Sequence, residues 1–200
     1  MVRRDRTAPR PPQPEVPRSL REAQPYGVIR LTPMGLPLKV RRDSINRLNP
    51  ILADSMVLYA LYKKHHWLVA GPTSQQLHEL FDRHADEQRE IIDLVAERVV
   101  TLGGVAVGDP RQAAELTSIE RPPDGAEDAP AMLHRLARAH EVVIPKVRKA
   151  VDATARRRDW TTNDLLIGDV LRRNETQAWF VAAHLVDVWP VVSDTDVRTA

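Results

Sequence analysis

The amino-acid sequence predicts an all-α protein, a four-helix bundle with a long crossover between its second and third helices. Ala, Val and Leu fill most apolar positions and only two residues are Phe, which suits helices packed on helices better than a sandwich of strands. Four long segments also carry apolar residues at helical spacing. The connector between the second and third segments has about 25 residues, and in helical bundles such a connector joins two parallel helices.

The chain divides by composition into a basic tail (residues 1–45), the bundle (46–189) and a short C-terminal tail (190–200). Residues 1–45 contain ten Arg or Lys and four acidic residues, a net charge of +6, so the remaining residues carry −4. Half of the 16 prolines lie before residue 38, which predicts an extended arm. The more apolar stretch from Tyr26 to Val40 either lies against the bundle or stays free of it.

The first two helices of the bundle are marked by residues that begin and end helices. The first is expected to start at Asn49 as N-cap, with Pro50 at the first helical position, and to stop before "GP" at residues 71–72. The second is expected to start at Thr73, which would form a capping box with Gln76, and to end at "GG", residues 103–104. It would be about 43 Å long.

The second half of the chain predicts a short helix in the crossover and two more long helices. The short helix is expected near residues 112–116. The third long helix is expected from about Pro130 to Arg157, with Asp128 as its cap, and the fourth from Asn163 to about Val188.

Four residues of metal-ligand type on the second helix are spaced so that they can form one site between two chains. His66 ends the first helix, and His78 and Asp82 lie four residues apart on one face of the second. Asp93 and Glu97 form a similar pair, with nearly the same azimuth but about 16 Å farther along the axis. No single ion can touch both pairs within one chain. Antiparallel packing of two copies about a two-fold axis would bring them together, with two equivalent sites per dimer.

The ligand types favour iron. The chain has no cysteine, so any metal must be held by His, Asp or Glu. Imidazole and carboxylate ligands together suit Fe(II), Mn(II) or Zn(II), and open coordination positions would let iron meet an oxidant.

The run "HHWLVAGPTSQQLHELFDRHADEQREIIDLVAERVVTLGG" resembles the Dps family (DNA-binding proteins from starved cells) of the ferritin-like superfamily. The resemblance extends over residues 49–188 and is supported by "NETQAWFVAAHL" in the last helix. The sequence departs from the usual pattern at Leu68 and Gln75, and neither is a ligand position. The positions that match the family's iron ligands are His66, His78, Asp82, Asp93 and Glu97, with Trp67 beside them.

The resemblance implies a ferritin-like bundle and a homododecamer that encloses a cavity. Members of the family act as ferroxidases: they oxidise Fe(II), preferably with hydrogen peroxide, and store the ferric product as mineral, which protects DNA from oxidative damage. It further implies that each iron site lies at the two-fold interface and takes its two halves from different subunits.

The sequence leaves two interpretations open for several other residues. Trp67 is either part of the core or a ring that quenches stray oxidising equivalents. Asp164 and Asp169 either line an iron entry pore or form a solvated first helical turn, where acids favour the helix N-terminus. No role is assigned to the remaining histidines, which are His65, His84, His134, His140 and His184.

The basic arm raises DNA as a second partner. Several copies of the arm on one particle would bind phosphates with avidity, whereas its prolines, its acids and the lack of an aromatic residue before Tyr26 argue against binding. One alternative is therefore a nucleoid-compacting protein in which iron oxidation is secondary. Another is a bundle that keeps the motif only as a hydrogen-bond network. The candidate DNA contacts are Arg3, Arg4, Arg6, Arg10, Arg18 and Arg21.

The sequence predicts no association with a membrane. No uncharged apolar run approaches the roughly 20 residues that are needed to cross a bilayer. A cytoplasmic location is expected, with association with the nucleoid if the arm binds DNA.

Overall fold

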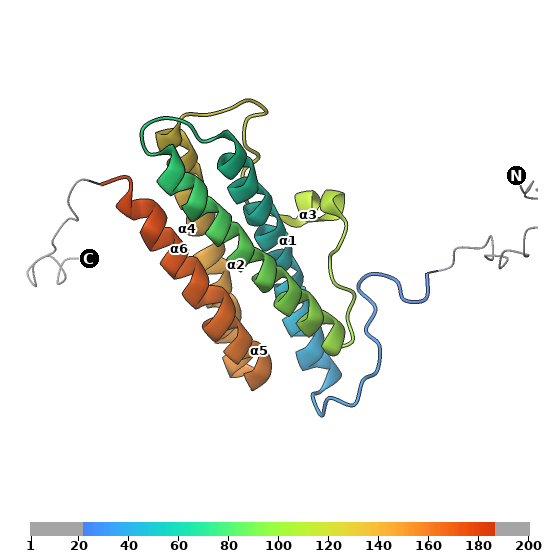
Figure 1. Ribbon diagram of the computed structural model, residues 1–200. Helices are drawn as coiled ribbons and strands as arrows, with labels where there is room; N and C mark the ends of the chain where they lie inside the picture. The colour runs from blue at the N-terminus through green and yellow to red at the C-terminus, as the bar shows by residue number, and fades with distance from the viewer. Residues whose placement is uncertain (1–21, 187–200) are drawn as a thin grey trace, which may run out of the picture.

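The computed structural model describes residues 22–186, which form a bundle of long helices with no strand in that range (Figure 1). The prediction of an all-α bundle is confirmed. The first two bundle helices are α1 (Leu38–Leu68) and α2 (Ser74–Thr101), which form an antiparallel hairpin. The third is α4 (Ala129–Arg156). The fourth consists of α5 (Trp160–Leu165), the π-helical segment η1 (Leu166–Leu171) and α6 (Arg172–Ala183).

The long crossover between α2 and α4 carries the short helix α3 (Pro110–Leu116), which lies outside the bundle beside α1 (Figure 1). Asp109 caps α3, and Asp128 caps α4 by accepting a hydrogen bond from the Ala131 amide, as predicted for Asp128. All four helices of the bundle contribute to one contiguous apolar core. No helix between residues 22 and 186 is long and apolar enough to cross a bilayer.

The predicted start of the first helix at Asn49 is wrong, because α1 begins eleven residues earlier, at Leu38. The Asn49 side chain is buried: its amide nitrogen donates to the Val105 carbonyl at 3.1 Å, and its oxygen accepts from the Val107 amide at 3.1 Å. Asn49 therefore fastens the crossover to α1 instead of capping a helix. Pro50 lies inside α1, and the boundary drawn at residue 46 between tail and bundle falls within this helix.

The segment that precedes α1 lies against the C-terminal end of α2. The buried Arg41 side chain donates to the Leu102 carbonyl at 2.7 Å and to the Arg30 carbonyl at 2.5 Å. The Arg30 amide in turn donates to the Gly103 carbonyl at 2.7 Å. The stretch from Tyr26 to Val40 is thus ordered against the bundle, which decides between the two interpretations of it.

Gly103 makes this contact feasible. Its φ of +89° lies in the left-handed region, and a Cβ added there would stand 2.2 Å from the Arg30 carbonyl oxygen. Gly103 and Gly104 close α2 by donating to the Val100 and Val99 carbonyls, as in a Schellman motif. The end of α2 agrees with the prediction.

One predicted capping interaction and both predicted ends of the fourth helix differ from the structure. Thr73 precedes α2 without a side-chain capping bond, so the capping box with Gln76 does not form. The fourth helix begins at Trp160, where the buried Asp159 caps it, and ends at Ala183 rather than near Val188. The π-helical segment within it was not predicted, because nothing in the local apolar pattern distinguishes it from an α-helix.

Candidate metal centre

His66 and His78 face each other across the turn between α1 and α2. The His66 Nδ1 donates to the His78 carbonyl at 2.9 Å, and the His78 Nδ1 donates to the His66 carbonyl at 2.8 Å. Their rings are stacked, with centroids 3.7 Å apart. A carbonyl oxygen can only accept, so each Nδ1 must carry the proton. Nε2 is therefore the ring nitrogen through which each histidine, in its neutral form, would bind a metal ion.

Asp82 lies one helical turn beyond His78, and its Oδ1 is 3.8 Å from the His66 Nε2. The Lys63 ammonium donates to this carboxylate, and the hydrogen bond is the main cause that lowers the pKa of Asp82 below its ordinary value. Asp82 is therefore ionised, and a metal ion that binds it would have to displace the Lys63 ammonium. Sequence reasoning missed Lys63, although its position three residues before His66 puts both on one face of α1.

Asp93 and Glu97 are exposed on α2 and lie apart from the other three candidates, at the axial separation of about 16 Å that the helical rise requires. Within residues 22–186, no three His, Asp or Glu side chains of one chain are placed to hold a metal ion. The structure thus brings together His66, His78 and Asp82 but does not bring them to Asp93 and Glu97.

Trp67, next to His66, is 70% exposed, so the interpretation that it belongs to the core of the chain is wrong. Asp164 is exposed, and Asp169 forms an ion pair with Arg173 at 3.4 Å within the same helix. A pore would need further copies of the chain, so its assignment to these two residues stays a prediction. The six arginines of the arm lie outside the described residues.

The histidines without an assigned role fall into two groups. His134 and His184 are exposed. His65 is fully buried, and burial lowers the pKa of its imidazole to about 4, so the ring is neutral at neutral pH. His84 and His140 are buried in the bundle, where both contact Tyr62.

A largely apolar groove of about 610 Å³ runs between α1, α2 and the crossover. Met56, Tyr59 and Ala60 line it from α1, Ile92 from α2 and Ala113 from α3. Arg89 also lines the groove and lies one helical turn before Asp93, so the groove borders the face of α2 that carries the second pair of predicted ligands.

Comparison with known proteins decides the family. The ferritin-like domain model matches residues 45–188. DNA protection during starvation protein 2 of Bacillus anthracis is 31% identical over 146 residues, which are 73% of this chain and 99% of that protein. The chain belongs to the Dps family. The solved structure of DpsC from Streptomyces coelicolor is 54% identical, with a TM-score of 0.83 over 86% of this chain and 100% of that one.

A further relative in the Dps group is named for DNA. The nutrient stress-induced DNA-binding protein of Synechococcus is 31% identical over 162 residues, or 81% of this chain and 92% of that protein. Both of these relatives are thus named for DNA, one for its protection and one for its binding.

Proposed function

We propose that this Dps-family chain is a ferroxidase that oxidises Fe(II) at sites shared between two copies and stores the ferric product inside a shell of twelve. The pair of crossed hydrogen bonds between His66 and His78 carries the proposal. These bonds fix the orientation of both imidazoles, the His66 Nε2 lies 3.8 Å from the Asp82 carboxylate, and the three side chains would form half of a site.

The ligand set suits Fe(II), because two imidazoles and carboxylates without thiolate bind a borderline ion and leave positions open to an oxidant. Hydrogen peroxide takes up two electrons as its O–O bond breaks, so each molecule oxidises two Fe(II) ions. The reaction removes both reagents that together generate hydroxyl radicals. This would protect DNA near the particle.

The second half of the site is proposed to come from the partner's α2. An antiparallel pair of α2 helices would bring Asp93 and Glu97 of one copy to His78 of the other. The groove of about 610 Å³ supports this arrangement, because it gives the same face an apolar surface for a second copy to cover.

The test uses two double variants, His78→Ala with Asp82→Ala, and Asp93→Ala with Glu97→Ala. Each should assemble as the parent protein does and fail to oxidise Fe(II) rapidly when peroxide is added. Co-expression of the two should restore activity, because a mixed pair of chains has one site with all ligands. Random mixing would restore about a quarter of the sites in a two-fold pair.

Three results would contradict the proposal. Rapid oxidation by either double variant alone would remove its residues from the site. Two inactive variants that stay inactive in mixed particles would show that the halves do not come from different chains. An assembled parent protein that binds no Fe(II) anaerobically would make the histidine pair structural.

A second function, sequence-independent DNA binding, is proposed for the arm. Residues 1–21 contain six arginines and two acids, a net charge of +4, and an assembly would present many copies of the arm. The named DNA-binding relative supports this role. If DNA compaction is the main activity, loss of the iron ligands should leave protection of DNA unchanged.

A further inference from the structure

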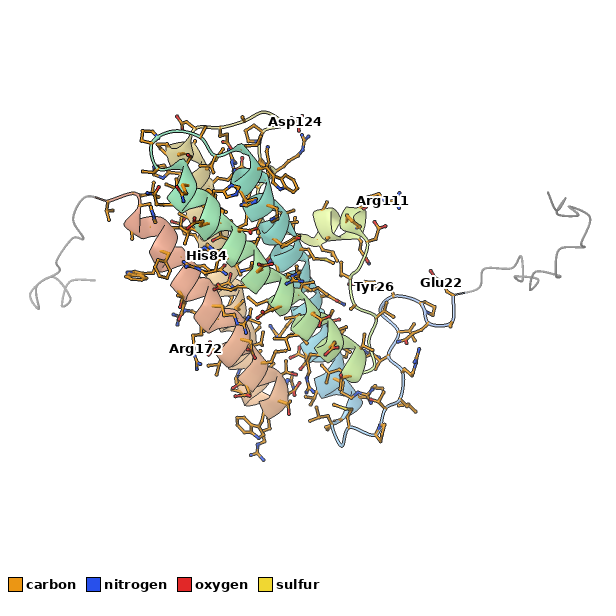
Figure 2. The ribbon with its side chains drawn as sticks, in the orientation of Figure 1. Glu22, Tyr26, His84, Arg111, Asp124 and Arg172 are labelled. Carbon is orange, nitrogen blue, oxygen red and sulfur yellow. The ribbon has the colours of Figure 1, made fainter. Side chains whose placement is uncertain are left out.

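The middle of the bundle holds a tyrosine between two histidines from other helices. The Tyr62 side chain of α1 is fully buried, and its hydroxyl lies 2.7 Å from the His140 Nε2 of α4. It also lies 3.2 Å from the His84 Nδ1 of α2. His84, labelled in Figure 2, points into the bundle from α2. The three side chains thus form a hydrogen-bonded triad across three helices.

Tyr62 and His140 are both neutral at neutral pH. Burial raises the pKa of Tyr62 and lowers the pKa of His140 to about 4. The phenol has one proton, and the shorter contact indicates that it is donated to the His140 Nε2. The His84 Nδ1 then donates to the phenol oxygen.

The surroundings of the triad do not form a metal site. The neighbouring Gln88 donates to Asn174 at 3.2 Å and to Gln177 at 2.9 Å, so α2 and α6 are joined by neutral amides. Within the described residues, no three His, Asp or Glu side chains here could hold an ion. A purely structural core position is filled with less cost by Phe, which needs no partner. Tyr62 instead has a proton acceptor at short distance.

Tyr62 also lies close to the proposed iron site. It precedes His66 by one turn of α1, a rise of about 6 Å. Its ring centroid is 6.2 Å from that of Phe81, which directly precedes Asp82 in α2. Two short paths therefore connect the phenol with residues proposed to hold iron.

We propose that Tyr62 is a one-electron donor to the iron site and that His140 takes up its proton. This rests on the proposed ferroxidase function. When one Fe(II) is bound, peroxide needs two electrons and the ion supplies one. Tyr62 supplies the second: the O–O bond breaks to give two hydroxide ions, Fe(II) becomes Fe(III), and Tyr62 becomes a neutral tyrosyl radical. The phenol proton moves to the His140 Nε2, so no proton has to leave the core.

The radical is then removed by the next Fe(II). That ion gives one electron to the tyrosyl oxygen and becomes Fe(III), while His140 returns the proton. In total, two Fe(II) ions and one peroxide give two Fe(III) ions and two hydroxide ions. Without Tyr62, reduction of peroxide by a single Fe(II) would release a hydroxyl radical.

The experiment compares the parent protein with Tyr62→Phe and Tyr26→Phe. Both variants lose one phenol hydroxyl group, but Tyr26 is exposed in the segment before α1 and does not contact the histidines. Each assembled protein receives one Fe(II) per site and then peroxide. Freeze-quenched samples are examined by electron paramagnetic resonance, and released hydroxyl radical is measured with a spin trap. The parent and Tyr26→Phe should show a tyrosyl radical. Tyr62→Phe should lose that signal and release severalfold more hydroxyl radical.

A second measurement tests the triad without iron. A photo-oxidised ruthenium complex removes one electron from the metal-free protein, and the resulting radical is recorded in the parent, in Tyr62→Phe and in His140→Phe. The Tyr62 radical should form in the parent, be absent from Tyr62→Phe and be at least tenfold weaker in His140→Phe, which lacks the proton acceptor. Hyperfine coupling to the shared proton should also disappear with His140.

The outcomes separate the two proposals. An unchanged tyrosyl signal in Tyr62→Phe, with or without iron, would overturn the role of Tyr62. An unchanged signal in His140→Phe would overturn the role of His140. Absence of Fe(II) oxidation in the parent protein would instead overturn the ferroxidase proposal, and the metal-free measurement would still decide whether Tyr62 is the oxidisable residue.

Discussion

Lys63 forms an ion pair with Asp82, whose carboxylate a metal ion would need as a ligand. Its ammonium pairs with Asp82, whose side chain is 46% exposed, so solvent screens the pair and its worth is modest. Replacement by Gln removes both a competitor and a positive charge that repels Fe(II). Lys63→Gln should therefore bind Fe(II) about twofold to fivefold more tightly, as measured by anaerobic calorimetry.

Lys64→Gln is the matched control, since it removes the same charge from a residue that donates to the Pro123 carbonyl instead of Asp82. Its affinity for Fe(II) should stay near that of the parent protein. Weaker binding by Lys63→Gln would mean that the lysine positions Asp82 rather than competes for it.

Side chains within one helix were predictable in a way that contacts between helices were not. The helical repeat alone places His78 and Asp82 on one face of α2. The short connection between α1 and α2 then brings them close to His66 at the end of α1. The contact of Tyr62 with His140 joins residues 78 positions apart. It depends on how α1 packs on α4, and no spacing in a single sequence specifies that.

At the scale of elements, the junction between α2 and the preceding segment should depend on Gly103. An Ala there would have an unfavourable positive φ, and its Cβ would meet the Arg30 carbonyl oxygen at 2.2 Å. Gly103→Ala should lower the free energy of unfolding by more than about 1 kcal/mol. Urea denaturation at fixed protein concentration measures this.

Gly108→Ala provides the comparison for Gly103, because a Cβ at Gly108 would meet nothing within 4 Å. Its effect should lie within about 0.5 kcal/mol of zero. Equal stability of the two variants would show that the close contact of Arg30 with α2 does not stabilise the fold.

Asp159 joins three elements and should make stability depend on pH. Burial favours its neutral form, but hydrogen bonds from Ser44 and Thr162, together with the charge of Arg98, lower its pKa below the ordinary value. A lowered carboxylate pKa stabilises the folded state above the unfolded value of about 3.9, and the gain is lost as pH falls through the folded value.

Asp159→Asn should therefore destabilise the protein by roughly 2 kcal/mol or more at pH 7, since it leaves Arg98 without its partner. The difference from the parent should shrink below about pH 4. Unfolding measured at both pH values tests this, with the exposed Asp152→Asn as control. A difference that does not change with pH would assign the effect to packing instead of charge.

Helix ends were predicted well where local residues decide them and wrongly where tertiary partners do. Asp128 caps α4 through its own backbone neighbour, Ala131, so its signal is local. Asn49 has the same kind of side chain, yet its partners Val105 and Val107 belong to the crossover. Only the packed fold shows whether an Asn or Asp side chain caps a helix or holds a distant segment of the chain.

At the scale of the whole molecule, the proposed binding of DNA is assigned to residues 1–21 rather than to the whole basic segment. The predicted tail of residues 1–45 carries +6, but residues 22–45 account for only +2 of this. Arg41 in that part is buried and holds the segment to α2. Removal of all 45 residues would delete the start of α1 and damage the fold, so a loss of DNA binding would have no single cause.

Deletion of residues 1–21 is the sharper test, since it removes six arginines and leaves every described contact in place. The truncated protein should assemble and oxidise Fe(II) as the parent does, and should lose DNA binding in a mobility-shift assay. In the parent, log K should fall linearly with log of the salt concentration, by about 0.9 for each phosphate contacted. Replacing the same arginines with Lys keeps the charge and should retain most binding. DNA binding that survives the deletion with an unchanged salt dependence would place the contact on the bundle and leave the arm without that role.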